Sequence, residues 1–133
     1  MSNRILIGAS GVSAVLTVIT RRVLGPEPLA DELDLRLTCL AEGDFSDVML
    51  SHADFTRANL RTVNLTGAFI PYANLTDADL TGASLVDTYI GAANLTGAKL
   101  IGADLTGADL RGANLTRITY DLTTQWPDGF TPP

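Results

Sequence analysis

Reactive side chains are scarce in this sequence, and their spacing supports little catalytic chemistry. His52 is the only histidine and Cys39 the only cysteine among the 133 residues. Asp54 lies two residues after His52 and is a possible partner for it, but no nucleophile is organised with the pair. One cysteine forms no intrachain disulfide, and the chain has no His/Cys ligand set for a metal ion. The sequence therefore predicts no enzyme, no catalytic residue, no metal site and no cofactor.

The element that would position these side chains is a five-residue repeat, which runs without a slip from Ala41 to Tyr120. Each unit ends in a large apolar residue, with usually Ala two positions earlier and mostly Asn or Asp between them. The large residues are Phe45, Leu50, Phe55, Leu60, Leu65, Ile70, Leu75, Leu80, Leu85, Ile90, Leu95, Leu100, Leu105, Leu110, Leu115 and Tyr120. Because a strict internal period outweighs local propensity, this repeat decides the fold.

A period of five fits neither a helix nor a simple strand. It fits a chain that turns a corner in every unit, with the large and the small residue pointing inward and the other three facing water. Coils of such a chain stack at strand spacing, about 4.8 Å, and stability comes from the stacking. Two residues at the inward positions do not fit the apolar pattern, and these are Gly43 and Thr88. Six glycines share one repeat position, where we expect a corner and not a phosphate-binding loop: Gly67, Gly82, Gly97, Gly102, Gly107 and Gly112.

The A(D/N)LXX pattern of these units resembles the pentapeptide-repeat family. The resemblance implies an all-β solenoid, a right-handed quadrilateral β-helix, with about four coils over 41–60, 61–80, 81–100 and 101–120. The ending Tyr120…Trp126-Pro127…Gly129-Phe130 is similar to endings of cyanobacterial members of the family.

An uncharged apolar run at 5–20 lies between Arg4 and Arg21. We interpret 1–24 as an apolar helix and membrane anchor over 5–24, because the two arginines after the run can extend toward the membrane surface. Small and hydroxyl side chains at helical spacing suit packing against another membrane helix; they are Ala9, Ser10, Ser13, Ala14 and Thr17. A cleaved secretory signal and a soluble helix or strand packed on the solenoid end are the alternatives.

The segments on either side of the repeat are interpreted as a linker and caps. In 25–40, Gly25-Pro26-Glu27-Pro28 is typical of a linker, and the leucines that follow predict a short amphipathic helix that covers the first coil. These leucines are Leu29, Leu33, Leu37 and Leu40. Cys39 is expected to be buried under that helix. In 121–133 the repeat ends, and we expect Trp126 to cover Leu115 and Tyr120.

Residues twenty apart should stack on one side of the solenoid. One side replaces the usual Asn or Asp with Met49, Phe69 and Tyr89, with His52 and Tyr72 alongside. Exposed methionine and aromatic residues are typical of an interface core, so we hypothesise that these five residues bind a protein partner. The alternative is a ladder of rings that only stack on one another.

The sequence favours a non-enzymatic interaction or scaffold module, tethered to a membrane and docked on a larger membrane complex as an accessory subunit or assembly factor. If the source is cyanobacterial, the membrane is the thylakoid or plasma membrane; a secreted, periplasmic or cytoplasmic location is the alternative. The rival functions are a DNA-mimic modulator of a topoisomerase, as some family members are, and a soluble free-standing scaffold. A net charge of −6 argues against nucleic acid as a partner, and a narrow Leu/Ala interior leaves no pocket for a small-molecule substrate.

Overall fold

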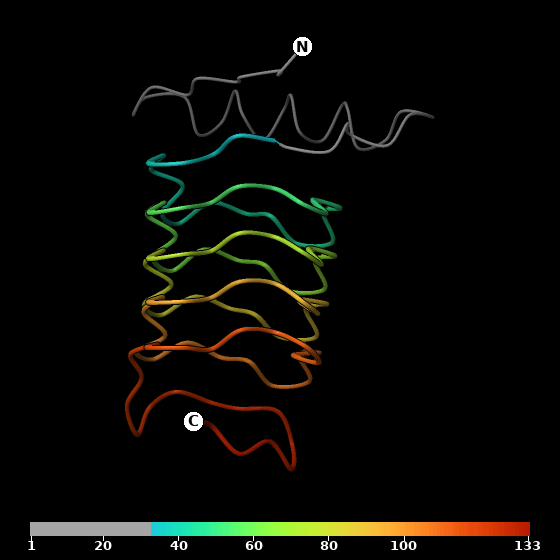
Figure 1. The fold of residues 1–133 in the computed structure, drawn as a ribbon, viewed down its shortest axis with the longest axis vertical. Coiled ribbons are helices and arrows are strands. Elements are labelled where there is room, and N and C mark those ends of the chain that lie inside the picture. Colours follow the sequence, from blue (N-terminus) through green and yellow to red (C-terminus); the bar gives the residue numbers. More distant parts are fainter. Residues whose placement is uncertain (1–32) are drawn as a thin grey trace.

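In the computed structural model, which describes residues 33–133, the chain winds into a stack of coils (Figure 1). Backbone pairing consists of isolated parallel bridges between residues twenty positions apart, from Asp34 with Asp54 to Lys99 with Thr119. No helix occurs over 33–133. Four five-residue units therefore complete one coil, as the resemblance to the pentapeptide-repeat family implies.

The coils have four sides, and each side is named here by its outward bridge residues. Side 1 carries Asp34, Asp54, Asn74, Asn94 and Asn114; side 2 carries Cys39, Asn59, Asp79, Lys99 and Thr119; side 3 carries Asp44, Asn64, Ser84 and Asp104; side 4 carries Met49, Phe69, Tyr89 and Asp109.

Each side is three extended residues followed by a two-residue corner. On side 1, Asn74 N donates to Ala53 O at 2.9 Å, and Phe55 N donates to Asn74 O at 2.7 Å. The corner after Phe55 is closed by a hydrogen bond from Ala58 N to Phe55 O at 2.9 Å. The second corner residue has a positive φ, as at Arg57 with 57°. Glycine adopts this conformation without strain, which explains why so many units carry it there.

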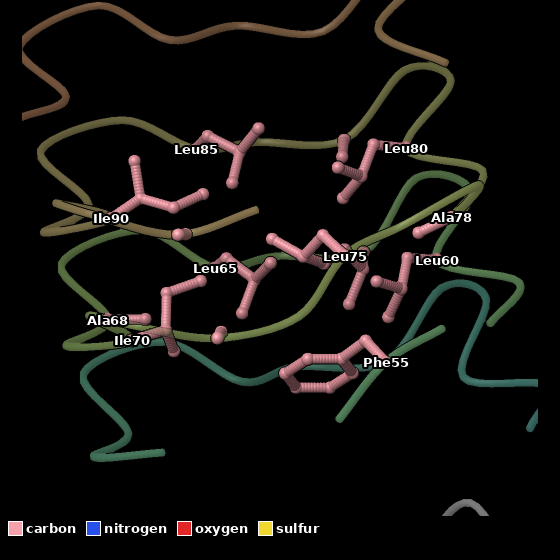
Figure 2. Close-up of a cluster of buried hydrophobic side chains, with 14 of the residues drawn as sticks. Phe55, Leu60, Leu65, Ala68, Ile70, Leu75, Ala78, Leu80, Leu85 and Ile90 are labelled. Atoms are coloured by element: carbon pink, nitrogen blue, oxygen red, sulfur yellow. The ribbon is translucent and has the colours of Figure 1, made fainter. Parts of the chain in front are cut away.

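The core is a set of columns of large residues stacked along the solenoid axis (Figure 2). Leu75, Leu85 and Leu95 have no exposed surface, and the alanines two positions before the large residues are buried from Ala53 to Ala108. Each buried Leu or Ile contributes roughly 1.5–3 kcal/mol relative to exposure. Because no coil encloses its own core, this contribution depends on the coils above and below it.

The two inward departures have physical explanations. Gly43 lies beside a larger ring than most units carry, and a Cβ at this position would come within 2.7 Å of Phe45 Cε2. The glycine therefore makes room for Phe45. Thr88 is fully buried, and its hydroxyl donates to Leu65 O at 2.7 Å. This hydrogen bond offsets the cost of burying a polar group.

The helix predicted to cap the first coil is wrong over 33–40, the part of it that the structure describes. These residues already follow the coil pattern, because Leu35 and Leu40 continue the five-residue spacing of Phe45 and are fully buried. Leu37 occupies a corner with φ 58° and is 75 % exposed, instead of covering the coil. Cys39 takes the outward bridge position and is exposed, so the expected burial of its thiol is also wrong.

At the other end the chain pairs once more before it leaves the solenoid. Gln125 bridges Asp104, a spacing of one residue more than the regular twenty. Buried Thr124 then takes the small inward position, and its hydroxyl donates to Leu100 O at 2.9 Å. Trp126 packs edge-on against Tyr120, with ring centroids 5.3 Å apart, and stacks on Phe130. The tail thus places aromatic rings against the last coil.

Candidate functional site

Five exposed side chains form a continuous strip on side 4 and its following corner. Met49, Phe69 and Tyr89 lie on successive coils, joined by the bridges Met49 with Phe69 and Phe69 with Tyr89. Their exposed fractions are 57 %, 38 % and 38 %. At the corner beside them, Tyr72 is 61 % exposed and His52 lies one coil before it. These five residues are called the aromatic surface below.

The rings of the aromatic surface stack along the solenoid axis. Phe69 and Tyr89 have centroids 4.9 Å apart and planes 12° apart, and His52 and Tyr72 have centroids 5.0 Å apart and planes 9° apart. Both separations follow from the coil spacing of about 4.8 Å. The ring faces therefore stack on each other, and the side chains remain exposed at the surface. The self-stacking ladder exists, and it leaves apolar side chains exposed on this side.

On the other sides the outward Asn or Asp hydrogen-bonds to its own corner. Asn94 Oδ1 accepts from Thr96 N at 3.1 Å and from Thr96 Oγ1 at 2.6 Å. Such local bonds from Asn and Asp to a nearby turn are a main reason for their frequency there. Met49, Phe69 and Tyr89 cannot make this bond. Side 4 therefore gives up, on three coils, a stabilising contact that the repeat supplies elsewhere.

The corner residues of side 4 are adapted to the bulky side chains. Pro71 follows Phe69 by two positions and has no N–H for a polar residue to bond. Gly91 follows Tyr89 in the same way, and a Cβ there would lie 3.4 Å from Tyr89 Cζ and Oη. The tyrosine ring thus extends over the glycine. Proline and glycine at these two corner positions therefore suit an aromatic residue two positions earlier, whereas the usual threonine suits an Asn or Asp there.

The aromatic surface ends at Asp109, where side 4 returns to the common pattern. Arg111 Nε donates to Asp109 Oδ1 at 2.8 Å, and Arg111 N donates to the same oxygen at 3.1 Å. The hydrogen bond from the Arg111 side chain lowers the pKa of Asp109. This ion pair is a polar boundary on the coil that follows the aromatic surface.

The structure does not join His52 to Asp54. Asp54 Oδ1 accepts from Thr56 N at 3.0 Å and from Thr56 Oγ1 at 2.6 Å, while His52 stacks on Tyr72. Within residues 33–133 no group of three His, Cys, Asp or Glu side chains is placed to hold a metal ion. The histidine therefore belongs to the aromatic surface and not to an acid–base pair.

Two acidic residues beside the aromatic surface were not recognised as its neighbours from the sequence. Asp47 and Asp87 are exposed at the corner between sides 3 and 4, two residues before Met49 and Tyr89. The signal was present, because residues twenty or forty apart share a corner in a twenty-residue coil. It was hidden by Gly67, which interrupts the acidic column.

The residues predicted to pack in a membrane lie outside the described part of the chain: Ala9, Ser10, Ser13, Ala14 and Thr17. The same holds for the linker at 25–28 and for the rest of the segment before Leu33. Over residues 33–133, no helix has the length and apolarity needed to cross a membrane.

The sequence profile of pentapeptide repeats matches the chain in eight copies, over residues 32–67, 58–91 and 73–117. No curated protein matches it. Among solved structures, a pentapeptide-repeat protein from Nostoc is 28 % identical, with 90 % of this chain and 88 % of that chain covered and a TM-score of 0.45. HetL, a pentapeptide-repeat protein of Nostoc involved in heterocyst differentiation regulation, is 32 % identical, covering 74 % and 42 %, with a TM-score of 0.40.

A third similar structure is a pentapeptide-repeat protein from the Arabidopsis thaliana thylakoid lumen. It is 27 % identical over 71 % of this chain and 70 % of that chain, with a TM-score of 0.36.

Proposed function

Because the chain belongs to the pentapeptide-repeat family, whose members fold as right-handed quadrilateral β-helices, we propose that it is a non-enzymatic interaction module. Its binding site is the aromatic surface, and its partner is a protein. The family consists in general of structural and interaction modules, which agrees with a solenoid whose interior is filled by Leu and Ala side chains.

The observation that carries this proposal is the exchange of capping residues for exposed apolar ones on a single side. Met49, Phe69 and Tyr89 forgo the hydrogen bonds that Asn and Asp make on side 1, and they expose apolar surface instead. A surface that gives up local stabilisation and gathers methionine and aromatic residues has the composition of an interface core. The backbone of the strip is held by bridges between coils, so binding requires little ordering of the protein.

We also propose that the partner belongs to a membrane complex, with this chain as an accessory subunit or assembly factor. Support comes from the sequence alone, through the uncharged run at 5–20 and the arginines that border it. A tether through 5–24 would hold the solenoid near the membrane and raise the effective concentration of a partner there.

The binding site is tested by changing Phe69 and Tyr89 to Asn together in the full chain. Tagged wild-type and variant proteins are recovered from native cells, and co-purifying proteins are quantified by mass spectrometry. We expect the variant to lose a partner that the wild type retains, because its apolar strip is removed. Leu37→Asn is the control, since Leu37 is also an exposed apolar residue but lies at the corner between sides 1 and 2, outside the aromatic surface. Unchanged partner recovery by the double variant would refute the proposed site.

The tether is tested separately by fractionating cells that express the full chain or a chain without residues 1–24. We expect the full chain to sediment with membranes and the shortened chain to leave them. If both forms stay in the soluble fraction, the membrane part of the proposal fails while the binding site remains open to the first experiment.

A further inference from the structure

Charge is divided unevenly around the solenoid. On sides 1 and 2, and on the corner between them, acidic residues pair with cations. Arg57 Nε lies 3.8 Å from Asp77 Oδ2, and Asp79 Oδ2 lies 3.4 Å from Arg61 Nη1 and 3.9 Å from Lys99 Nζ. Carboxylates within 4 Å of a cation contribute little to the distant field of the protein.

The corner between sides 3 and 4 has the opposite character. Asp47 and Asp87 are exposed there, and neither makes an ion pair among the described residues. The residues of side 3 and this corner, at 43–47, 63–67, 83–87 and 103–107, include no lysine or arginine. The aromatic surface is therefore bordered along one edge by uncompensated negative charge.

Aspartate and glycine alternate along this corner, so that Gly67 lies between the two carboxylates. Gly67 and Gly107 follow Asp47 and Asp87 by one coil, and a Cβ at either glycine would overlap the Oδ1 atom of that aspartate. Each carboxylate thus lies over a glycine and not over another acid. Asp47 and Asp87 are two coils apart, about 10 Å at the usual strand spacing. This separation limits their mutual repulsion and leaves both open to a partner.

We propose that the partner of the aromatic surface is a cationic protein segment, which places apolar side chains on the rings and arginine or lysine side chains against Asp47 and Asp87. This inference rests on the proposed function and names the chemistry of the partner. Charge complementarity favours it, because exposed charges of one sign steer oppositely charged partners and reject others. The same negative border disfavours an anionic lipid surface or nucleic acid on this face.

The inference is tested with three short labelled peptides of equal length, in which leucine alternates with arginine, with glutamate or with serine. Binding to the full chain is measured by fluorescence anisotropy at low and high salt. We expect the arginine–leucine peptide to bind about tenfold or more tightly than the glutamate–leucine peptide at low salt. The preference should shrink at high salt, because screening acts on exposed charges. Equal binding of the two peptides, or no binding of the arginine–leucine peptide, overturns the inference.

Two sets of variants separate the roles of charge and rings. Changing Asp47 and Asp87 to Asn should weaken the arginine–leucine peptide by about three- to tenfold, as expected for exposed charge pairs, and leave the serine–leucine peptide unchanged. The single change Asp87→Asn has a matched control in Asp77→Asn, because each removes one negative charge at the same corner position, with φ 54° for Asp87 and 55° for Asp77, and Asp77 lies on the opposite corner, between sides 1 and 2. An equal effect of the control would show that net charge, and not this corner, is responsible.

Failure of this inference can be told apart from failure of the proposed function. If the native partner is lost with the Phe69 and Tyr89 changes but kept with the Asp47 and Asp87 changes, the site stands and the cationic partner is wrong. If vesicles of phosphatidylserine and phosphatidylcholine bind the wild-type chain and not the Phe69 and Tyr89 variant, the occupant is a lipid surface, which also overturns the inference.

Discussion

Side 1 and side 4 share one backbone and differ in what their outward residues contact. On side 1, Asn74 and Asn94 bond to the corner of their own unit, with Oδ1 accepting from Thr76 Oγ1 and Thr96 Oγ1 at 2.6 Å. On side 4, Phe69 and Tyr89 contact the neighbouring coil, ring against ring. On side 1 the outward polar groups are hydrogen-bonded within their own unit. On side 4 the outward residues are apolar and remain exposed to water.

This difference teaches that the repeat constrains its inside much more than its outside. Ile70 on side 4 and Leu75 on side 1 are both fully buried, and Ala68 and Ala73 occupy equivalent positions. The outward bridge position only has to be compatible with an extended backbone. A solenoid can therefore change the chemistry of one side without changing its core, which is how a repeat protein acquires a binding surface.

The largest effect should be the same on both sides. Leu75→Ala on side 1 and Ile70→Ala on side 4 each leave a cavity in a fully buried column, and each should lower the free energy of unfolding by about 2–5 kcal/mol. Urea unfolding followed by circular dichroism measures both. Leu122→Ala is the control, because Leu122 is fully exposed and its removal creates no cavity. A much smaller loss for Ile70→Ala would mean that side 4 also differs on the inside.

The corners should give the next largest effect. Gly107→Ala places a Cβ on a residue with φ 71° and into contact with Asp87, so we expect a loss of about 1–3 kcal/mol. Gly102→Ala has a similar φ of 66°, but its nearest neighbour is 3.5 Å away, so only the cost of the backbone conformation applies. Thermal unfolding of the two variants separates these causes. Adding Asp87→Ala to Gly107→Ala should recover the part of the stability that is lost to the overlap, so that the remaining loss equals that of Gly102→Ala. If no stability is recovered, the overlap with Asp87 is not the cause.

A smaller effect separates the two surfaces themselves. Asn94→Ala removes hydrogen bonds to Thr96 N and Thr96 Oγ1 and should cost about 1 kcal/mol. Met49→Ala removes a side chain that is 57 % exposed and bonds to no corner, so its cost should be smaller. Urea unfolding of both variants under one condition gives the comparison. Equal losses would show that Met49 stabilises its coil as much as an Asn does.

The fold was predictable from the sequence because every inward position repeats at a fixed interval. The stacking of Phe69 on Tyr89 followed from the twenty-residue coil that the family resemblance implies. Residues 33–40 were misinterpreted because Leu33, Leu37 and Leu40 match helical spacing, and only the five-residue spacing of Leu35 and Leu40 from Phe45 distinguishes a coil from a helix. The polar roles of the corners were harder to foresee, since a bond such as that from Arg111 to Asp109 depends on side-chain geometry that the repeat does not fix.

The smallest expected effect comes from giving side 4 the Asn residues that side 1 carries at its outward positions. Met49→Asn should place an oxygen near Ser51 N and Ser51 Oγ, as Asp44 does for Ser46 N at 3.1 Å and Ser46 Oγ at 2.7 Å on side 3. We expect a gain of about 0.5–1 kcal/mol in the free energy of unfolding. Phe69→Asn should bring no such gain, because Pro71 has no N–H to donate and the stack on Tyr89 is lost.

Thermal unfolding of the two single variants and of the Phe69→Asn, Pro71→Thr double variant tests this conversion. The double variant supplies the missing N–H together with a threonine hydroxyl, so it should regain stability relative to Phe69→Asn alone. A gain for Phe69→Asn without the change at Pro71 would contradict the argument, since it would mean that the capping bond is not what distinguishes side 1 from side 4. If the double variant gains stability as expected and still fails to bind the partner, the capping bond restores the coil but not the binding site, which needs the ring of Phe69.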